Sequence, residues 1–181
     1  MRFARLIFVI LFVIAAGATA LAQSSADAVK AAGLLSVDKV KQGAAVQAAV
    51  AVEISKGYHV NSNRPLDKFL IPAALKIEPL NGLSSSAVIY PRASMRKFPF
   101  SKGAMSVFEG RAVLRFTIRA LPSLGVGKYA LHAKLTFQAC NDQACLPPKT
   151  VDVGIPFEVV AAAAQVNNIN GDVFAPSRAK K

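Results

Sequence analysis

The sequence predicts an all-β protein, an antiparallel β-sandwich of about seven to nine short strands. Three observations support this fold class. Apolar and polar residues alternate with a period of two in most segments between residues 34 and 160. Turn signals built from glycine, proline and asparagine recur about every eight to twelve residues. The one alanine run, at residues 161–164, has no helix-capping residue beside it.

Four strands are expected in the first half of the domain, separated by glycine, proline and asparagine signals. They span residues 46–54, 58–60, 73–80 and 87–90. The first is the clearest, because Val46, Val50 and Ile54 fall on one face of an extended chain. The segment 61–72 is polar and is expected to be a loop.

Four more strands are expected in the second half, after a long loop at 92–103. They span residues 105–109, 112–120, 128–139 and 150–160. Leu114, Phe116 and Ile118 face one way, while the residues between them are mostly polar. This alternation predicts apolar faces that pack against each other.

The ends of the chain are expected to lie outside the folded domain. Arg2 and Arg5, followed by the apolar run 6–16, have the pattern of a secretory signal peptide, with cleavage after Ala22. The expected organisation is a signal peptide at 1–22, a loose leader at 23–33, the sandwich at 34–160 and a disordered tail at 161–181. No later segment is apolar for the ~18 residues of a membrane span. We therefore expect a periplasmic or otherwise exported protein without stable membrane insertion.

Chain length and net charge limit the classes of function that the sequence allows. Cleavage at the expected site leaves about 159 residues, enough for one core that needs no disulfide. The full sequence carries a net charge of +12. Its basic residues are scattered rather than clustered with aromatic residues, so nucleic acid is not an expected partner. The charge favours solubility and loose attraction to anionic surfaces.

The strongest functional signal is the pair Cys140 and Cys145, the only cysteines in the sequence. A bridge across so short a loop contributes roughly 2 kcal/mol in the chain-entropy treatment, less than a bridge between distant strands. A local pair is easy to open and close, as thiol–disulfide exchange requires. Export places the pair in an oxidising compartment, where it should be bonded at rest. The alternative is a non-catalytic binding or scaffold domain in which the bridge is only structural.

Four short motifs, taken in order, carry a resemblance to a known family. They are Gly57-Tyr58-His59-Val60, then Tyr90-Pro91, then Val107-Phe108-Glu109-Gly110, then Phe137-Gln138-Ala139-Cys140 with Cys145-Leu146-Pro147-Pro148. In this order they resemble the N-terminal periplasmic domain of the thiol:disulfide interchange protein DsbD, over roughly residues 46–160. The expected protein is a stand-alone form, without the transmembrane and thioredoxin-like domains.

The resemblance implies an immunoglobulin-like fold with a redox-active pair near one edge of the sandwich. It implies that Cys145 forms the mixed disulfide with a partner and that Cys140 resolves it. It also implies an aromatic cap in the loop 92–103, and the spacing does not choose between Phe98 and Phe100. The implied partners are other envelope thiol–disulfide proteins, such as thioredoxin-like domains and a membrane thiol reductase.

Other chemistry finds little support in the sequence, and no cofactor or metal is expected. His59 could approach the cysteines, but it is interpreted as a plain loop residue, and His132 is interpreted as an exposed strand residue. Together with the cysteines and Met95 or Met105 they could supply soft ligands for Cu(I), but the spacing matches no metal signature. No arrangement of serine, histidine and carboxylate suggests hydrolysis, and no phosphate-binding glycine loop is present. Any enzymatic activity is therefore expected to resemble that of a protein-disulfide reductase.

Overall fold

The computed structural model describes residues 24–174, so the expected signal peptide and residues 175–181 lie outside the described part. Two short helices, α1 (Ser25–Ala28) and α2 (Gly171–Phe174), flank the strands. The strands are β1 (Val29–Leu35), β2 (Val40–Lys41), β3 (Ala45–Ile54), β4 (His59–Asn61), β5 (Ala74–Ile77), β6 (Leu83–Ser85), β7 (Ser94–Arg96), β8 (Met105–Phe108), β9 (Arg111–Ala120), β10 (Gly127–Phe137), β11 (Ala139–Cys140) and β12 (Lys149–Val160).

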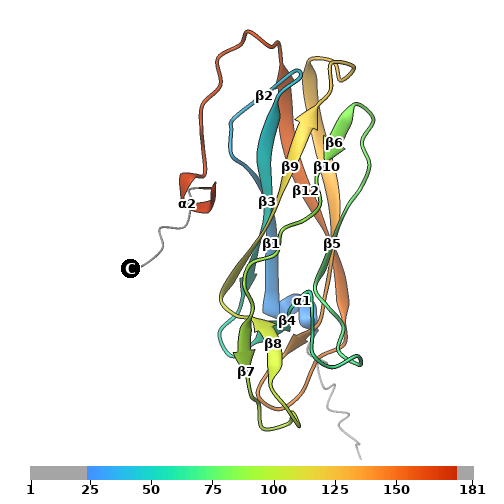
Figure 1. The fold of residues 1–181 in the computed structure, drawn as a ribbon, viewed down its shortest axis with the longest axis vertical. Helices are drawn as coiled ribbons and strands as arrows, with labels where there is room; N and C mark the ends of the chain where they lie inside the picture. The colour runs from blue at the N-terminus through green and yellow to red at the C-terminus, as the bar shows by residue number, and fades with distance from the viewer. Residues whose placement is uncertain (1–23, 175–181) are drawn as a thin grey trace, which may run out of the picture.

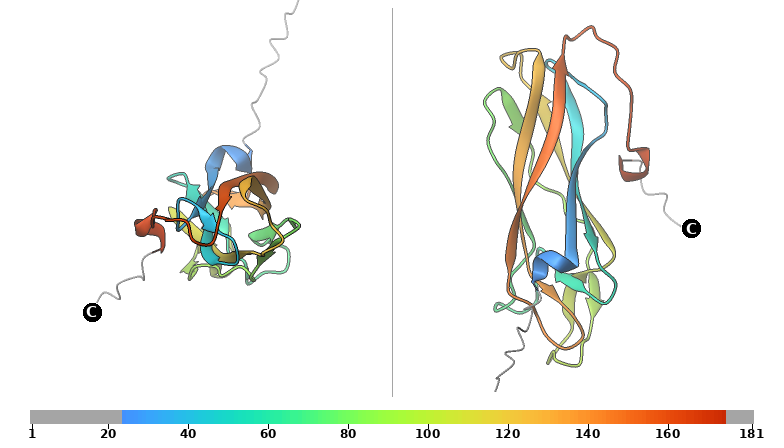
Figure 2. Two further views of the ribbon diagram at one scale, coloured as in Figure 1. Left: turned by 90° about the horizontal axis from the view of Figure 1, so that it is seen from above. Right: turned by 180° about the vertical axis from the view of Figure 1, so that it is seen from behind.

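Two sheets form the long walls of a sandwich, which is elongated in Figure 1 and seen from above and behind in Figure 2. Their strand orders are β1-β3-β9-β6 and β2-β12-β10-β5. The core between them includes Leu114, Leu131 and Phe137, each about 1% exposed. A third sheet, β11-β4-β8-β7, lies at the lower end of the molecule in Figure 1. The predicted all-β, immunoglobulin-like antiparallel sandwich is confirmed.

The long strands follow the predicted alternation. The segments predicted at 46–54, 112–120, 128–139 and 150–160 correspond to β3, β9, β10 and β12. In β9, Leu114, Phe116 and Ile118 are buried. The strand predicted at 87–90 is reduced to an isolated bridge between Ile89 and Arg115. The additional strands β2, β6, β7 and β11 span only two or three residues each and are too short to leave a periodic signal.

The segment expected to be a loose leader is part of the fold, which corrects that expectation for residues 24–33. It forms α1 and most of β1, and β1 pairs antiparallel with β3 along its full length. Gly33 explains how β1 approaches β12. A Cβ atom there would lie 2.7 Å from the carbonyl oxygen of Gly154 and 2.4 Å from Ile155 Cγ1, so only glycine fits without displacement.

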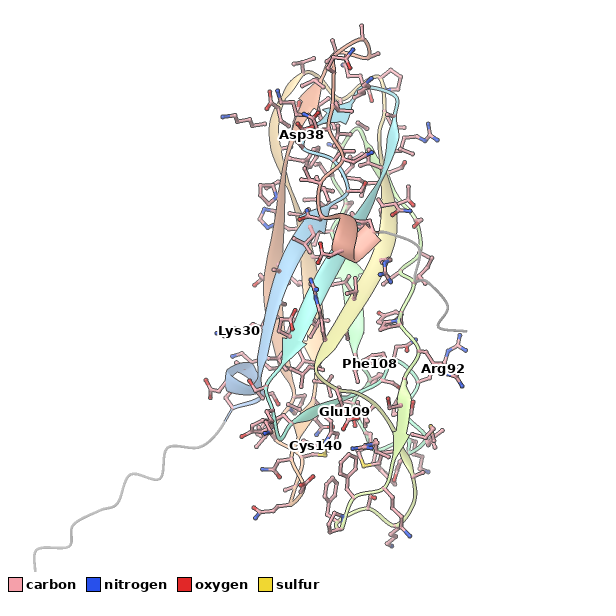
Figure 3. The ribbon with its side chains drawn as sticks, turned by 90° about the vertical axis from the view of Figure 1, so that its left-hand side faces the viewer. Lys30, Asp38, Arg92, Phe108, Glu109 and Cys140 are labelled. Atoms are coloured by element: carbon pink, nitrogen blue, oxygen red, sulfur yellow. A yellow bond between two sulfur atoms is a disulfide. The ribbon has the colours of Figure 1, made fainter. Side chains whose placement is uncertain are left out.

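The expected disordered tail is also corrected, for residues 161–174. The backbone N–H and side-chain amide of Asn167 both donate to the carboxylate of Asp38, at 2.8 Å each. Arg115 donates from Nη2 to the carbonyl of Val173 at 2.7 Å. The segment therefore runs back over the outer face of the β1-β3-β9-β6 sheet, where Figure 3 shows α2 lying in front of the strands. Polar contacts rather than an apolar period hold it there.

None of the helices within residues 24–174 has the length and apolar character that crossing a bilayer requires.

Candidate functional site

Cys140 and Cys145 form a disulfide at the end of the sandwich, with their Cα atoms 3.9 Å apart. Cys140 is the last residue of β11 and has no exposed surface, whereas Cys145 is partly exposed. Asn141 shapes the loop between them. Its Oδ1 accepts from the N–H groups of Gln143 and Ala144, both at 2.9 Å, in the Asx-turn manner. Figure 3 shows Cys140 low in the molecule, beside the loops of the third sheet.

The strands around the disulfide fix the position of Cys140. β11 pairs with β4, which places His59 directly opposite Cys140 in the register. The amide of Gln138 links three segments: its Nε2 donates to the Leu146 carbonyl at 3.2 Å, and its Oε1 accepts from Asn61 Nδ2 at 3.0 Å and Ile71 N–H at 3.2 Å. The cysteine loop is thus attached both to a strand and to the loop at 61–72.

Phe98, one of the two cap candidates, packs in the apolar cluster that contains Cys140. It is 8% exposed and belongs to a small apolar cluster with Met105, Val107 and Cys140, against which Leu70 and Cys145 also pack. Its ring stacks on the His59 ring with centroids 3.8 Å apart and planes 9° apart.

Phe100, the other cap candidate, lies further out. It is 37% exposed, and its ring centroid is 5.8 Å from that of Phe98 and 6.4 Å from that of His59. Ser101 fixes the turn between them, since its Oγ accepts from Phe98 N–H at 3.1 Å and donates to the Gly103 carbonyl at 2.8 Å. The three rings are nearly parallel, with Phe98 buried against His59 and Phe100 at the surface.

His59 lies beside Phe98 and Cys140, although the sequence favours a plain loop residue at this position. It lies in β4, is 2% exposed and stacks on the Phe98 ring. Burial lowers the pKa of His59 below its ordinary value of 6.5, while the charges of Glu109 and Asp142 oppose that shift and Arg96 adds to it. His59 Nε2 is buried and has no hydrogen-bond partner within residues 24–174. His59 therefore acts as a neutral aromatic ring at neutral pH.

This geometry predicts that acid weakens the packing of Phe98 on His59. In the closed state Phe98 packs on the buried His59 ring, and in the opened state His59 is in contact with water. Burial depresses the pKa of His59 in the closed state, so below about pH 6.5 the opened state binds a proton more readily. The closed state is therefore less favoured as the pH falls. We expect reduction of the disulfide by a phosphine to accelerate a few-fold, relative to a His59→Phe variant, between about pH 7.5 and pH 5.5. The His59→Phe variant keeps the stacked ring but does not titrate, so the ratio of the two rates removes the reductant's own pH dependence. A constant ratio would contradict the prediction.

The metal-binding alternative gains no support from the described residues. No group of three or more histidine, cysteine, aspartate or glutamate side chains within residues 24–174 is arranged to hold an ion. His132 is exposed on β10, as expected. Met95 is 57% exposed on β7, and Met105 is buried in the cluster beside Cys140.

A groove beside Phe100 has a mainly apolar lining, and its two charged lining residues are Asp67 and Lys102. It measures about 540 Å³ and is lined by the loops at 66–70 and 100–105. Leu66 and Phe69 are 64% and 80% exposed there. Lys68 Nζ lies 5.2 Å from the centre of the Phe69 ring, and Lys102 forms no salt bridge within residues 24–174.

Comparisons with known proteins identify the family to which the chain belongs. The family described as "Thiol:disulfide interchange protein DsbD, N-terminal" matches residues 31–155. Among solved structures, the chain is similar to the reduced N-terminal domain of DsbD from Neisseria meningitidis, with 17% identity and a TM-score of 0.48, covering 81% of this chain and 94% of that one. It is also similar to the N-terminal periplasmic domain of ScsB from Proteus mirabilis, with 14% identity and a TM-score of 0.48, covering 76% of this chain and 49% of that one. A comparison with curated proteins found no match.

Proposed function

Because the chain belongs to the family of the N-terminal domain of the thiol:disulfide interchange protein DsbD, we propose that it is an exported exchange module that relays electrons to or from partner proteins through Cys140 and Cys145. The observation that carries the proposal is a bonded, local cysteine pair in which one residue is buried beneath an aromatic cap and the other is partly exposed. Both the family and the bonded cysteine pair fit thiol–disulfide exchange.

The difference in exposure supports an assignment of roles. A partner thiolate attacks Cys145 Sγ, the S–S bond breaks, and Cys140 leaves as a thiolate that takes up a proton. A second partner thiolate then attacks the partner's own sulfur in the mixed disulfide, which leaves a partner disulfide and a second protonated thiol at Cys145. Two electrons and two protons have entered the protein. In the opposite direction Cys145 attacks a partner disulfide and Cys140 resolves the product.

The packing of Phe98 supports selectivity for protein partners over small thiols. Phe98 packs in the cluster that contains Cys140 and against which Cys145 packs, so a small thiol must displace it or wait for it to open. A protein partner can compensate for the displaced contacts by burying its own apolar surface in the groove at Leu66 and Phe69. We expect partners among envelope thiol–disulfide proteins, such as thioredoxin-like domains or a membrane thiol reductase.

Two measurements test the proposal. Equilibration with glutathione should give a reduction potential above about −230 mV, whereas a value below about −300 mV would mark an inert structural bridge. Trapping should be asymmetric. With thioredoxin as the probe, Cys140→Ser should accumulate a mixed disulfide through Cys145, and Cys145→Ser, which keeps only the buried thiol, should not. Equal trapping by both variants would overturn the assignment of roles.

A further inference from the structure

Ser25 connects the N-terminal turn to the cysteine loop. It is the first residue of α1, its side chain has no exposed surface, and it lies before the residues 31–155 that the family matches. Its Oγ donates to the Pro147 carbonyl at 2.6 Å and accepts from the Ala139 N–H at 3.2 Å. A single hydroxyl therefore uses both its donor and its acceptor capacity on the same loop.

The two partners of Ser25 are the two arms of that loop. Ala139 directly precedes Cys140, and Pro147 follows Cys145 after one intervening residue. Within the loop the arms are also joined by Leu146 N–H to the Ala139 carbonyl at 2.8 Å. Ser25 differs from this contact because it holds the arms together from outside the loop.

The turn that carries Ser25 is itself capped. Ser24 Oγ accepts from the Ala26 N–H at 3.2 Å, and the Asp27 carboxylate accepts from the Ser24 N–H at 3.2 Å, which is a capping box. Ser24 therefore caps α1, whereas Ser25 attaches α1 to the cysteine loop, and the two serines use separate contacts. This separation makes the role of Ser25 testable.

We propose that Ser25 is a positioning residue that keeps the arms of the cysteine loop together when the disulfide is open, and so favours its re-formation. The inference rests on the proposed redox function. In the oxidised protein the covalent bridge already fixes the arms, and Ser25 adds little restraint. In the dithiol protein the arms separate more freely without Ser25, which adds conformational freedom to the reduced state alone. The equilibrium therefore shifts toward the dithiol when the hydroxyl is removed.

The test is the equilibrium of the disulfide with glutathione, in which two glutathione thiols are oxidised for each protein disulfide reduced. Ser25→Ala should shift this equilibrium toward the dithiol by about fivefold, the effect of one hydrogen bond of ordinary strength, or about 20 mV for a two-electron couple. Ser24→Ala is the matched control, because it removes the cap of α1 and leaves both contacts of Ser25. It should change the equilibrium by less than about twofold.

Denaturant unfolding of both redox forms separates positioning from simple stabilisation. Ser25→Ala removes the same hydrogen bonds from both forms, but the reduced form recovers conformational freedom in the loop arms and the bridged form does not. If Ser25 positions the thiols, the oxidised form therefore loses more stability than the reduced form, by the same factor as the glutathione shift. Equal losses in the two forms with an unchanged glutathione equilibrium would overturn the inference. A wild-type potential below about −300 mV would instead count against the redox function, whatever Ser25→Ala does.

Discussion

Phe98→Ala is expected to speed reduction of the Cys140–Cys145 disulfide by glutathione about ten- to hundredfold. Burial of a phenylalanine side chain stabilises the closed state by about 1.5–3 kcal/mol, and a stacked aromatic pair adds about 0.5–1.5 kcal/mol. A factor of ten corresponds to about 1.4 kcal/mol. Phe98 is 8% exposed and packs in the cluster with Cys140. We expect its removal to lose about 1.4–2.8 kcal/mol of this stabilisation, because the rest of the loop still packs there. Stopped-flow or quenched reduction assays measure the rate directly.

Phe100→Ala is the matched control. It removes the same ring from the same loop, but from a position that is 37% exposed and outside the cluster around Cys140. We expect its rate to change by less than about threefold, because little buried apolar area is lost. Similar acceleration by both variants would mean that the whole loop, rather than the Phe98 ring, limits access.

Phe137→Ala is expected to lower the free energy of unfolding by about 3–5 kcal/mol. Phe137 ends β10, is 1% exposed, and lies between the two walls of the sandwich just before the cysteine segment. Removing its ring loses the transfer free energy of the buried atoms and leaves a cavity that β10 cannot close, because β5 and β12 pair with it on both sides. Urea unfolding of the oxidised protein gives the value.

Phe69→Ala is the control for this loss. Its side chain is 80% exposed, so the free energy of unfolding should change by no more than about 0.5 kcal/mol. A loss below about 1.5 kcal/mol for Phe137→Ala would be inconsistent with a ring fixed in a close-packed core. Both variants remove a phenylalanine, so the comparison isolates burial.

The sequence predicts the long strands well because each carries its own signal. In β9 and β10 every second side chain is apolar over about ten residues, and that period is typical of a strand with one buried face. The cysteine pair is equally visible, because spacing and composition alone distinguish it. These features depend on residues that are close together in the chain.

The sequence does not reveal features that depend on distant partners. β1 reads as a run of alanine, glycine and leucine without alternation, and its conformation is set by pairing with β3. His59 lies in a three-residue strand whose burial depends on Cys140 and Phe98, both far along the chain. Ser25 is one serine among several, and no local pattern marks it as the one that bridges the cysteine loop.

The C-terminal segment illustrates the same limit with polar residues. Asn170 adopts a left-handed conformation with φ 53°, which asparagine tolerates better than most residues, and its side chain donates to the Leu35 carbonyl at 2.8 Å. Together with the contacts of Asn167 and Arg115, this holds residues that composition alone assigns to disorder. Hydrogen bonds to single carbonyl and carboxylate oxygens produce no periodic pattern in a sequence.

The position of α1 beside the cysteine loop, and of α2 halfway along the sandwich, has a practical consequence for handling the protein (Figure 1). A label or bead linker attached ahead of Ser24 would crowd the end at which exchange is proposed to occur. One attached after Phe174 would leave that end open. Surface-immobilised assays should therefore couple the chain through its C-terminal side, so that the end with the disulfide faces the solution.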